Sequence, residues 1–319
     1  MSSATLTFDL VRICMALPFG IQPLNAVGSA PFHWQGPLEF VGTKILSSQR
    51  ATVLRGVIRS SQDPSVEREV VCKYRGGDIS TIEHEARIYQ EQLEELQGVA
   101  VPRFHGLFTG AHYERDGKKI DVACIFLEYF EQDRKWDLWK GPIKTRGEIA
   151  VAMLKIHFSG IMHCAFRDEH VLVSADGEVR IVDFAHACEH DCDADPVINV
   201  WAWETSRRNY GCDEMYNVYQ QLGLWTPRFV PFMATYADIF AYPDAEALGQ
   251  WFFDRFCCSN DPAAAEDVKE SAKWALERYY ARYEERFPKI GDPRKLKNER
   301  EQRALRDGSE TPASPSGSS

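Results

Sequence analysis

Hydrophobic and polar positions alternate along the first part of the chain, as they do in β-strands that bury one face. The pattern runs over Leu38–Val41 and Thr52–Ile58, and a third apolar run covers Glu69–Tyr74. Two more strands are predicted near Val101–Leu107 and Val122–Tyr129, with Asp116-Gly117 as the turn between them. Residues 38 to 130 are therefore predicted to contain five strands.

One helix interrupts this series of strands. Ser80 is followed three residues later by Glu83, the spacing of a capping box, and Gly98 provides a stop signal. The residues between these signals place their apolar side chains at helical spacing, on one face of the predicted helix: Ile82, Ala86, Tyr89, Leu93 and Leu96.

The remainder of the chain is mostly helical in its patterning. Helices are predicted over Thr145–Ser159 and Cys212–Leu222, from Asp244 to Phe256, and from Pro262 to about Phe287. Strands followed by helices indicate an α+β fold, which we expect to form two lobes.

A short pair of strands lies between these helices. Val171–Val173 and Val179–Val182 flank Asp176-Gly177, a hairpin turn signal, and Gly160 ends the preceding helix. Two strands this short are not stable alone, so they must pack against something larger.

Composition narrows the classes of function. The 319 residues carry a net charge of −10, which argues against non-specific nucleic-acid binding.

Nine cysteines at scattered positions indicate reduced thiols in an intracellular protein, cytoplasmic or nuclear. Asp9 and Arg12 interrupt the only apolar stretch near the N-terminus, so we expect no signal peptide and no membrane span. Residues 292 to 319 are charged and then rich in Ser, Pro and Gly, which predicts a disordered tail.

The order of residues from His157 to Ala187 resembles the catalytic loop and metal-binding segment of the protein-kinase-like superfamily. His163 matches the loop histidine and Asp183-Phe184 matches the metal-binding pair. Ala165 stands where the family has its catalytic Asp, and His170 stands where it has a magnesium-binding Asn. The chain resembles small atypical fungal kinase-like domains with a degenerate catalytic loop. The resemblance implies an N-terminal extension at 1–37, an N-lobe at 38–130 and a C-lobe at 131–291.

The resemblance also implies a nucleotide site in the N-lobe. Lys73, on a strand, matches the lysine that holds the phosphates of ATP, and Glu85 matches the helix glutamate that fixes it. The alternative interpretation is that Lys73 is an ordinary strand lysine that faces solvent or lies at a sheet edge. Glu128 to Phe130 match the hinge that binds adenine, although the segment also reads as a buried strand. Ser48 lies in the phosphate loop, which lacks its glycines here.

The resemblance also implies which residues would bind the metal ion and which would act as the catalytic base. Asp183 would hold Mg²⁺, with His170 as a second ligand, although imidazole is a poor ligand for this oxygen-seeking ion. Ala165 cannot accept a proton, so Asp168 is the candidate replacement for the catalytic base. Asp168 and its neighbour Glu169 are otherwise ordinary exposed loop carboxylates.

His186, Cys188, His190 and Cys192 alternate after the Asp-Phe pair, so an extended backbone would place all four on one face. A soft-metal site is conceivable, but the spacing does not match the usual zinc pairs. The resemblance instead suggests a truncated activation region.

These features predict a pseudokinase that binds a nucleotide, ATP with or without magnesium, and interacts with a protein partner of unknown identity. An atypical ATP-dependent phosphotransferase and a ligand-free scaffold are the alternatives. Neither nucleic acid nor membrane is an expected partner.

Overall fold

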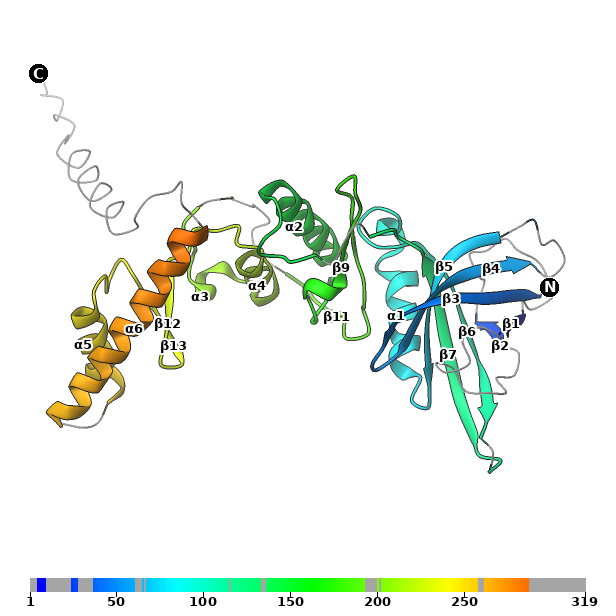
Figure 1. Cartoon of the computed structure of the whole chain (residues 1–319), viewed down its shortest axis with the longest axis horizontal. Coiled ribbons are helices and arrows are strands. Elements are labelled where there is room, and N and C mark those ends of the chain that lie inside the picture. Colours follow the sequence, from blue (N-terminus) through cyan, green and yellow to red (C-terminus); the bar gives the residue numbers. More distant parts are fainter. Residues whose placement is uncertain are drawn as a thin grey trace, which may run out of the picture. The chain divides into compact units, whose positions relative to one another are not determined.

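The computed structural model describes residues 5–9, 24–27, 37–60, 65, 67–114, 116–132, 136–192, 200, 202–257 and 261–286. The fold is mixed α+β, as the sequence predicts. The chain divides into two compact units, which are described separately (Figure 1). The first comprises Met1–Ile198 with Tyr210–Leu224, and the second comprises Asn199–Asn209 with Trp225–Ser319.

Within the described residues, seven strands of the first unit form a closed sheet in the order β1-β2-β6-β7-β5-β4-β3. The strands are β1 (Thr5–Asp9), β2 (Leu24–Val27), β3 (Leu38–Ser48), β4 (Thr52–Ser60), β5 (Glu67–Gly76), β6 (Phe104–Tyr113) and β7 (Lys119–Glu128). Neighbours from β2 to β3 are antiparallel, and β1 closes the sheet by pairing antiparallel with β2 and parallel with β3.

The five predicted strands correspond to β3–β7, but the predicted start of β6 is wrong. β6 begins at Phe104, because Val101 makes only an isolated bridge to Gln97. β1 and β2 come from the segment preceding residue 38, for which the sequence predicted no strand.

Alternating side chains of the strands fill the interior of this sheet. Leu38 and Phe40 on β3, Leu54 on β4 and Phe126 on β7 belong to one buried cluster. Phe40 packs edge-on against Phe126, with ring centroids 5.2 Å apart. Burial of this apolar area is the main stabilising contribution to the sheet.

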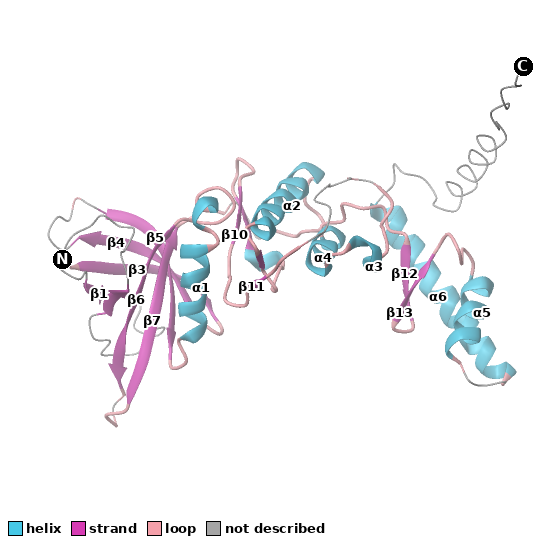
Figure 2. Cartoon of the chain, turned by 180° about the vertical axis from the view of Figure 1, so that it is seen from behind, coloured by secondary structure: helices cyan, strands magenta, loops and turns pink. Residues whose placement is uncertain are grey.

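The helix α1 (Ser80–Glu91) contacts β5, β6 and β7 (Figure 2). The predicted capping box is wrong: Ile79 is the N-cap residue, and Ser80 Oγ donates to Asp78 Oδ1 at 2.6 Å. The helix also ends earlier than predicted, and a 3₁₀ turn, η1 (Glu94–Leu96), leads to Gly98, whose φ is +74°.

The rest of the first unit carries short elements around one long helix. They are α2 (Ile143–Phe158), β8 (Ile161–Met162), η2 (Asp168–His170), β9 (Val171–Val173), β10 (Val179–Ile181), β11 (Cys188–Glu189) and α4 (Asp213–Gln221). Gly160 and Gly177 have φ of +87° and +85°, so the predicted helix stop and hairpin turn are both confirmed. The β9–β10 hairpin is connected to the loop before β6, where the Ile181 N–H donates to Ala100 O at 2.8 Å.

The second unit contains the hairpin β12 (Phe229–Phe232) and β13 (Thr235–Asp238) with α5 (Ala245–Phe256) and α6 (Pro262–Arg286). α3 (Arg207–Tyr210) crosses the boundary of the two units in the sequence. Asp244 caps α5 by accepting a hydrogen bond from the Ala247 N–H at 2.8 Å, as its position predicted. The β12–β13 hairpin was not predicted.

The predicted disordered tail, residues 292 to 319, lies outside the described residues. Of the helices that are described, none is both long and apolar enough to cross a bilayer.

Candidate functional site

Three charged side chains from distant parts of the first unit meet at one point. Lys73 Nζ, on β5, lies 2.6 Å from Glu85 Oε2 on α1. The same nitrogen lies 2.5 Å from Asp183 Oδ1, just after β10. The sequence separations are 12 and 110 residues, so only the fold brings these groups together.

Lys73 and Glu85 form a nearly buried pair. Their side chains are 13% and 1% exposed. Burial alone lowers the pKa of Lys73, but the carboxylates of Glu85 and Asp183 outweigh it, so the pKa of Lys73 is raised. The ammonium is therefore charged at neutral pH. Glu85 also accepts a hydrogen bond from the Phe184 N–H at 3.2 Å, which connects α1 to the Asp183-Phe184 pair.

Asp183 has an unusual backbone conformation. Its φ is +73°, in the left-handed region that non-glycine residues rarely adopt. Hydrogen bonds on either side fix it there: the Val182 N–H donates to His170 O at 3.0 Å, and the Phe184 N–H is bound by Glu85. Strained conformations of this kind, which cost on the order of 1–3 kcal/mol, are concentrated at functional sites.

His170 is the second neighbour of the Asp183 carboxylate. Its Nε2 lies 3.1 Å from Asp183 Oδ2, and its Nδ1 lies 2.6 Å from Ala165 O. A carboxylate and a carbonyl can only accept, so both contacts are satisfied together when both ring nitrogens carry a proton. The pKa of Asp183 is well below its ordinary value, chiefly through the His170 hydrogen bond; burial opposes this, and the Lys73 charge adds to it.

His163 supports the loop and is not part of the charged group. Its Nε2 donates to Val182 O at 3.0 Å, and its Nδ1 accepts from the Ala165 N–H at 3.2 Å. Burial lowers the pKa of His163, which agrees with a neutral ring. The ring stacks at an angle against Phe184, with centroids 4.8 Å apart.

Asp168, the candidate base, lies in η2 and is half-buried. Burial, Asp137 and Glu169 raise its pKa, and its carboxylate accepts a hydrogen bond from the backbone of Leu138. The Asp168 carboxylate therefore interacts with the segment that contains Asp137 and Leu138. Asp183, in contrast, interacts with Lys73 and His170.

The remaining predicted nucleotide contacts have other partners. Ser48 is exposed at the end of β3, where it pairs with Thr52. The Glu128 N–H donates to Arg103 O at 2.8 Å, and its carboxylate accepts from the Arg103 N–H at 3.1 Å. Among the described contacts, none connects these two residues to Lys73.

Phe130, the third hinge residue, packs under a cation that the sequence did not single out. The Arg180 guanidinium lies 4.9 Å from the Phe130 ring centroid. Arg180 also donates to Gly98 O at 2.6 Å and Val99 O at 2.9 Å, so it connects the β9–β10 hairpin to the loop before β6. An arginine within a three-residue strand gives no sequence signal for this role.

The alternating His and Cys residues after Asp183 do not form one group. His186 Nε2 lies 3.3 Å from Arg50, and Cys188 Sγ lies 3.3 Å from Cys164 Sγ. His190 and Cys192 instead lie beside two residues that the sequence did not single out for this purpose, His157 and Cys212. The described cysteines are all free thiols.

Comparison with known proteins adds no family to this description: no protein-family model matches the sequence, and no curated protein matches it significantly.

Proposed function

We propose that this chain is a two-lobed protein-kinase-like domain that works as a pseudokinase, a module that binds a nucleotide and interacts with a protein partner. The observation that carries the proposal is the meeting of Lys73, Glu85 and Asp183 at distances of 2.5 and 2.6 Å. A strand lysine, a helix glutamate and an Asp-Phe pair are the groups that phosphoryl-transfer domains of this superfamily use to hold ATP.

The charges of these groups suit a polyphosphate. Lys73 is held in place by two carboxylates, so its ammonium is positioned before a ligand arrives. ATP carries the negative charge that would compete with Asp183 for this ammonium. Glu85, almost fully buried, would keep its contact with Lys73 in both states.

Two features argue against rapid phosphate transfer. Ala165 offers no side-chain base, and general-base catalysis contributes roughly 10²- to 10⁴-fold. In addition, both carboxylate oxygens of Asp183 already have partners, Lys73 Nζ and His170 Nε2. A magnesium ion at Asp183 would have to displace one of them. We therefore expect nucleotide binding that depends little on magnesium.

Thermal shift with ATP, with and without MgCl₂, tests the proposal on the full chain. The melting temperature should rise with ATP alone, and Lys73→Met should abolish the rise. Lys119→Met is the matched control, because Lys119 forms an exposed pair with Asp121 at 2.9 Å on the same sheet. If ATP leaves the wild-type melting temperature unchanged under both conditions, the ligand-free scaffold replaces this proposal.

A phosphotransferase is the second candidate, favoured by one observation: the raised pKa of Asp168, a property of general bases. Transfer of radiolabel from γ-labelled ATP to protein, small-molecule acceptors or water separates the candidates. Label transfer that is lost in Asp168→Asn supports the phosphotransferase, and its absence in the wild type supports the pseudokinase.

A further inference from the structure

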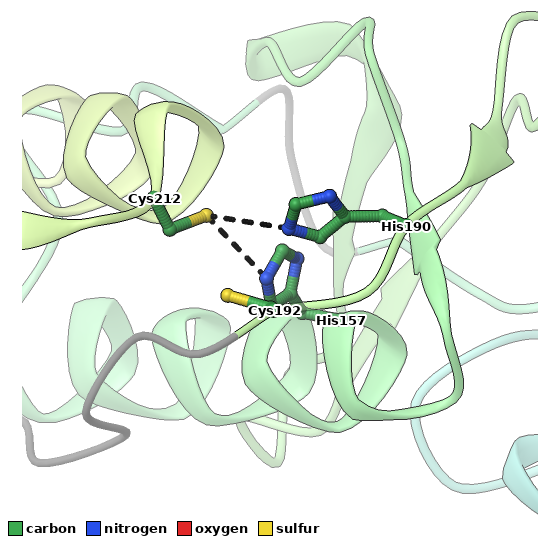
Figure 3. A group of neighbouring side chains, drawn as sticks. All are labelled: His157, His190, Cys192 and Cys212. Atoms are coloured by element: carbon green, nitrogen blue, oxygen red, sulfur yellow. Dashed lines mark hydrogen bonds between the residues drawn. The ribbon is translucent and has the colours of Figure 1, made fainter.

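Two imidazoles and two thiols gather at a place separate from the charged group at Asp183 (Figure 3). His157 belongs to the last turns of α2, His190 and Cys192 follow β11, and Cys212 directly precedes α4. One ligand atom of each residue lies within 4.8 Å of the others. Cys212 Sγ is 3.4 Å from His157 Nε2 and 3.9 Å from His190 Nε2.

We propose that these four residues, His157, His190, Cys192 and Cys212, form a structural zinc site. Zinc in proteins favours four ligands in a tetrahedron, and two cysteines with two histidines are a common set. With metal bonds of about 2.3 Å to sulfur and 2.0 Å to nitrogen, the ligand atoms of such a site are about 3.3 to 3.8 Å apart. The ligand atoms, now within 4.8 Å of one another, therefore need to close by no more than about 1.5 Å around a metal ion.

A carboxylate behind His157 supports this assignment. His157 Nδ1 lies 3.4 Å from Glu214 Oε2, whose side chain is 9% exposed. Glu214 is itself fixed, because its other oxygen accepts from the Cys164 N–H at 2.8 Å. A proton held on Nδ1 leaves the Nε2 lone pair directed at the centre of the cluster. Metal-binding histidines generally have such a partner, which fixes the tautomer and the ring orientation.

The backbone around the other ligands is also fixed by hydrogen bonds. The His190 N–H donates to Gly160 O at 2.8 Å, and Glu189 pairs with Ile161. The rings of His157 and His190 consequently lie with centroids 4.7 Å apart. Both rings face Cys212 in Figure 3.

The site would connect three segments that are far apart in the sequence. Cys212 is 22 residues from His190 and 55 from His157 in the sequence, and the chain enters the second unit between Cys192 and Cys212. A metal that closes loops of this length reduces the entropy of the unfolded chain and adds its binding free energy to folding. Four protein ligands leave no open position for a substrate, which indicates a structural role.

A second thiol pair provides a matched control. Cys164 Sγ and Cys188 Sγ are 3.3 Å apart, both residues are exposed, and they belong to the same unit. Neither is a member of the four-residue cluster. The double variant C164S/C188S therefore removes as many thiols as C192S/C212S and leaves the proposed ligands intact. Serine is also a favourable residue at the N-cap position that Cys212 occupies before α4.

The experiment measures metal content and metal spectra on the full chain. Each protein is produced with zinc, dialysed without chelator, and analysed by elemental mass spectrometry. We expect one zinc per chain for the wild type and for C164S/C188S, and less than a tenth of that for C192S/C212S. Zinc added back after chelation should raise the melting temperature of the first two proteins and not of the third.

Cobalt(II) titration of the chelated wild type gives a readout that needs no variant. A site with two thiolates and two imidazoles should show thiolate-to-cobalt charge transfer and the intense visible bands of tetrahedral cobalt. Zinc-free wild type that gives neither band overturns the proposal. It is also overturned if C164S/C188S loses the metal or if folded C192S/C212S retains it.

Discussion

His170 Nε2 lies 3.1 Å from Asp183 Oδ2, so an imidazole nitrogen occupies one of the two oxygens of this carboxylate. The ring is 12% exposed and its other nitrogen faces Ala165 O. The imidazole thus provides the Asp183 carboxylate with a hydrogen-bond partner from within the chain. We therefore expect the His170 ring to hinder a metal ion from binding this carboxylate oxygen.

Magnesium dependence should return when this histidine is replaced. In His170→Asn the amide oxygen replaces the imidazole, and one oxygen of Asp183 becomes available to a metal. We expect magnesium to strengthen ATP binding about tenfold in the variant, about 1.4 kcal/mol, and less than twofold in the wild type. Fluorescent ATP titrations with and without MgCl₂ measure this. Equal magnesium effects in both proteins contradict the argument.

Phosphate transfer in the proposed nucleotide site should appear when a carboxylate is also introduced at position 165. Ala165→Asp combined with His170→Asn supplies a carboxylate at the loop position and an amide ligand for magnesium. We expect ATP hydrolysis or transfer to rise about 10²-fold over the wild type, the lower end of the usual contribution of a general base. Each single variant serves as a control and should give less than the pair. A double variant that stays at wild-type turnover shows that the site lacks more than these two groups.

Removing the Lys73 ammonium should destabilise the fold. Lys73→Met leaves Glu85, which is 1% exposed, without its counter-charge, and breaking such a buried pair costs roughly 3–5 kcal/mol. Urea unfolding measures the loss. The exposed control Lys119→Met should unfold at the wild-type midpoint, because solvent screens its pair with Asp121. Equal midpoints for both variants and the wild type would show that the buried pair contributes nothing.

Stability should fall on mild acidification because of a buried histidine on β6. Burial, together with Arg68 and Arg103, lowers the pKa of His105 to about 4. The unfolded chain, with a pKa near 6.5, therefore binds more protons between pH 6.5 and 4 than the folded chain does. The free energy of unfolding should drop across this window, by up to about 1.4 kcal/mol per pH unit from this group.

Chemical denaturation at pH 7, 6 and 5 tests this dependence. In His105→Gln the slope between pH 7 and pH 5 should be smaller than in the wild type, whatever the absolute stability of the variant. An unchanged slope would assign the acid sensitivity to other groups.

Close packing between β3 and β4 makes one glycine of the sheet intolerant of any side chain. A Cβ at Gly56 would lie 2.5 Å from the Phe40 ring, so Gly56→Ala should cost roughly 1–3 kcal/mol or more by overpacking. Gly147 on α2 has no atom within 4 Å of such a Cβ, and Gly147→Ala should stabilise by up to about 1 kcal/mol. Unfolding midpoints of the two variants should therefore move in opposite directions. Movement in the same direction contradicts the close approach at Gly56.

Local patterns were sufficient for most elements. Alternating or apolar runs predicted β4, β5 and β7 to within three residues at each end, and the Asp244 cap predicted the start of α5. The start of β3 was also predicted, but this strand continues to Ser48, well beyond the predicted end at Val41. The predicted N-cap of α1 was wrong by one position: Ile79 is the N-cap residue, and the Ser80 hydroxyl bonds to Asp78 instead of the helix backbone. Side chains near a helix start have several acceptors within reach, and the sequence alone does not choose between them.

The sequence by itself determined most of the elements, since strand, helix and turn signals are local. The family resemblance singled out Lys73, Glu85 and Asp183 as candidate site residues. Only the tertiary structure decided what these residues and their neighbours touch. The His170 contact with Asp183, the pairing of β1 with β3, and the joining of His157 with Cys212 all depend on side chains or strands that the fold brings together from separate segments. Periodicity reports which face of an element is buried, whereas contacts between distant segments depend on how those faces pack.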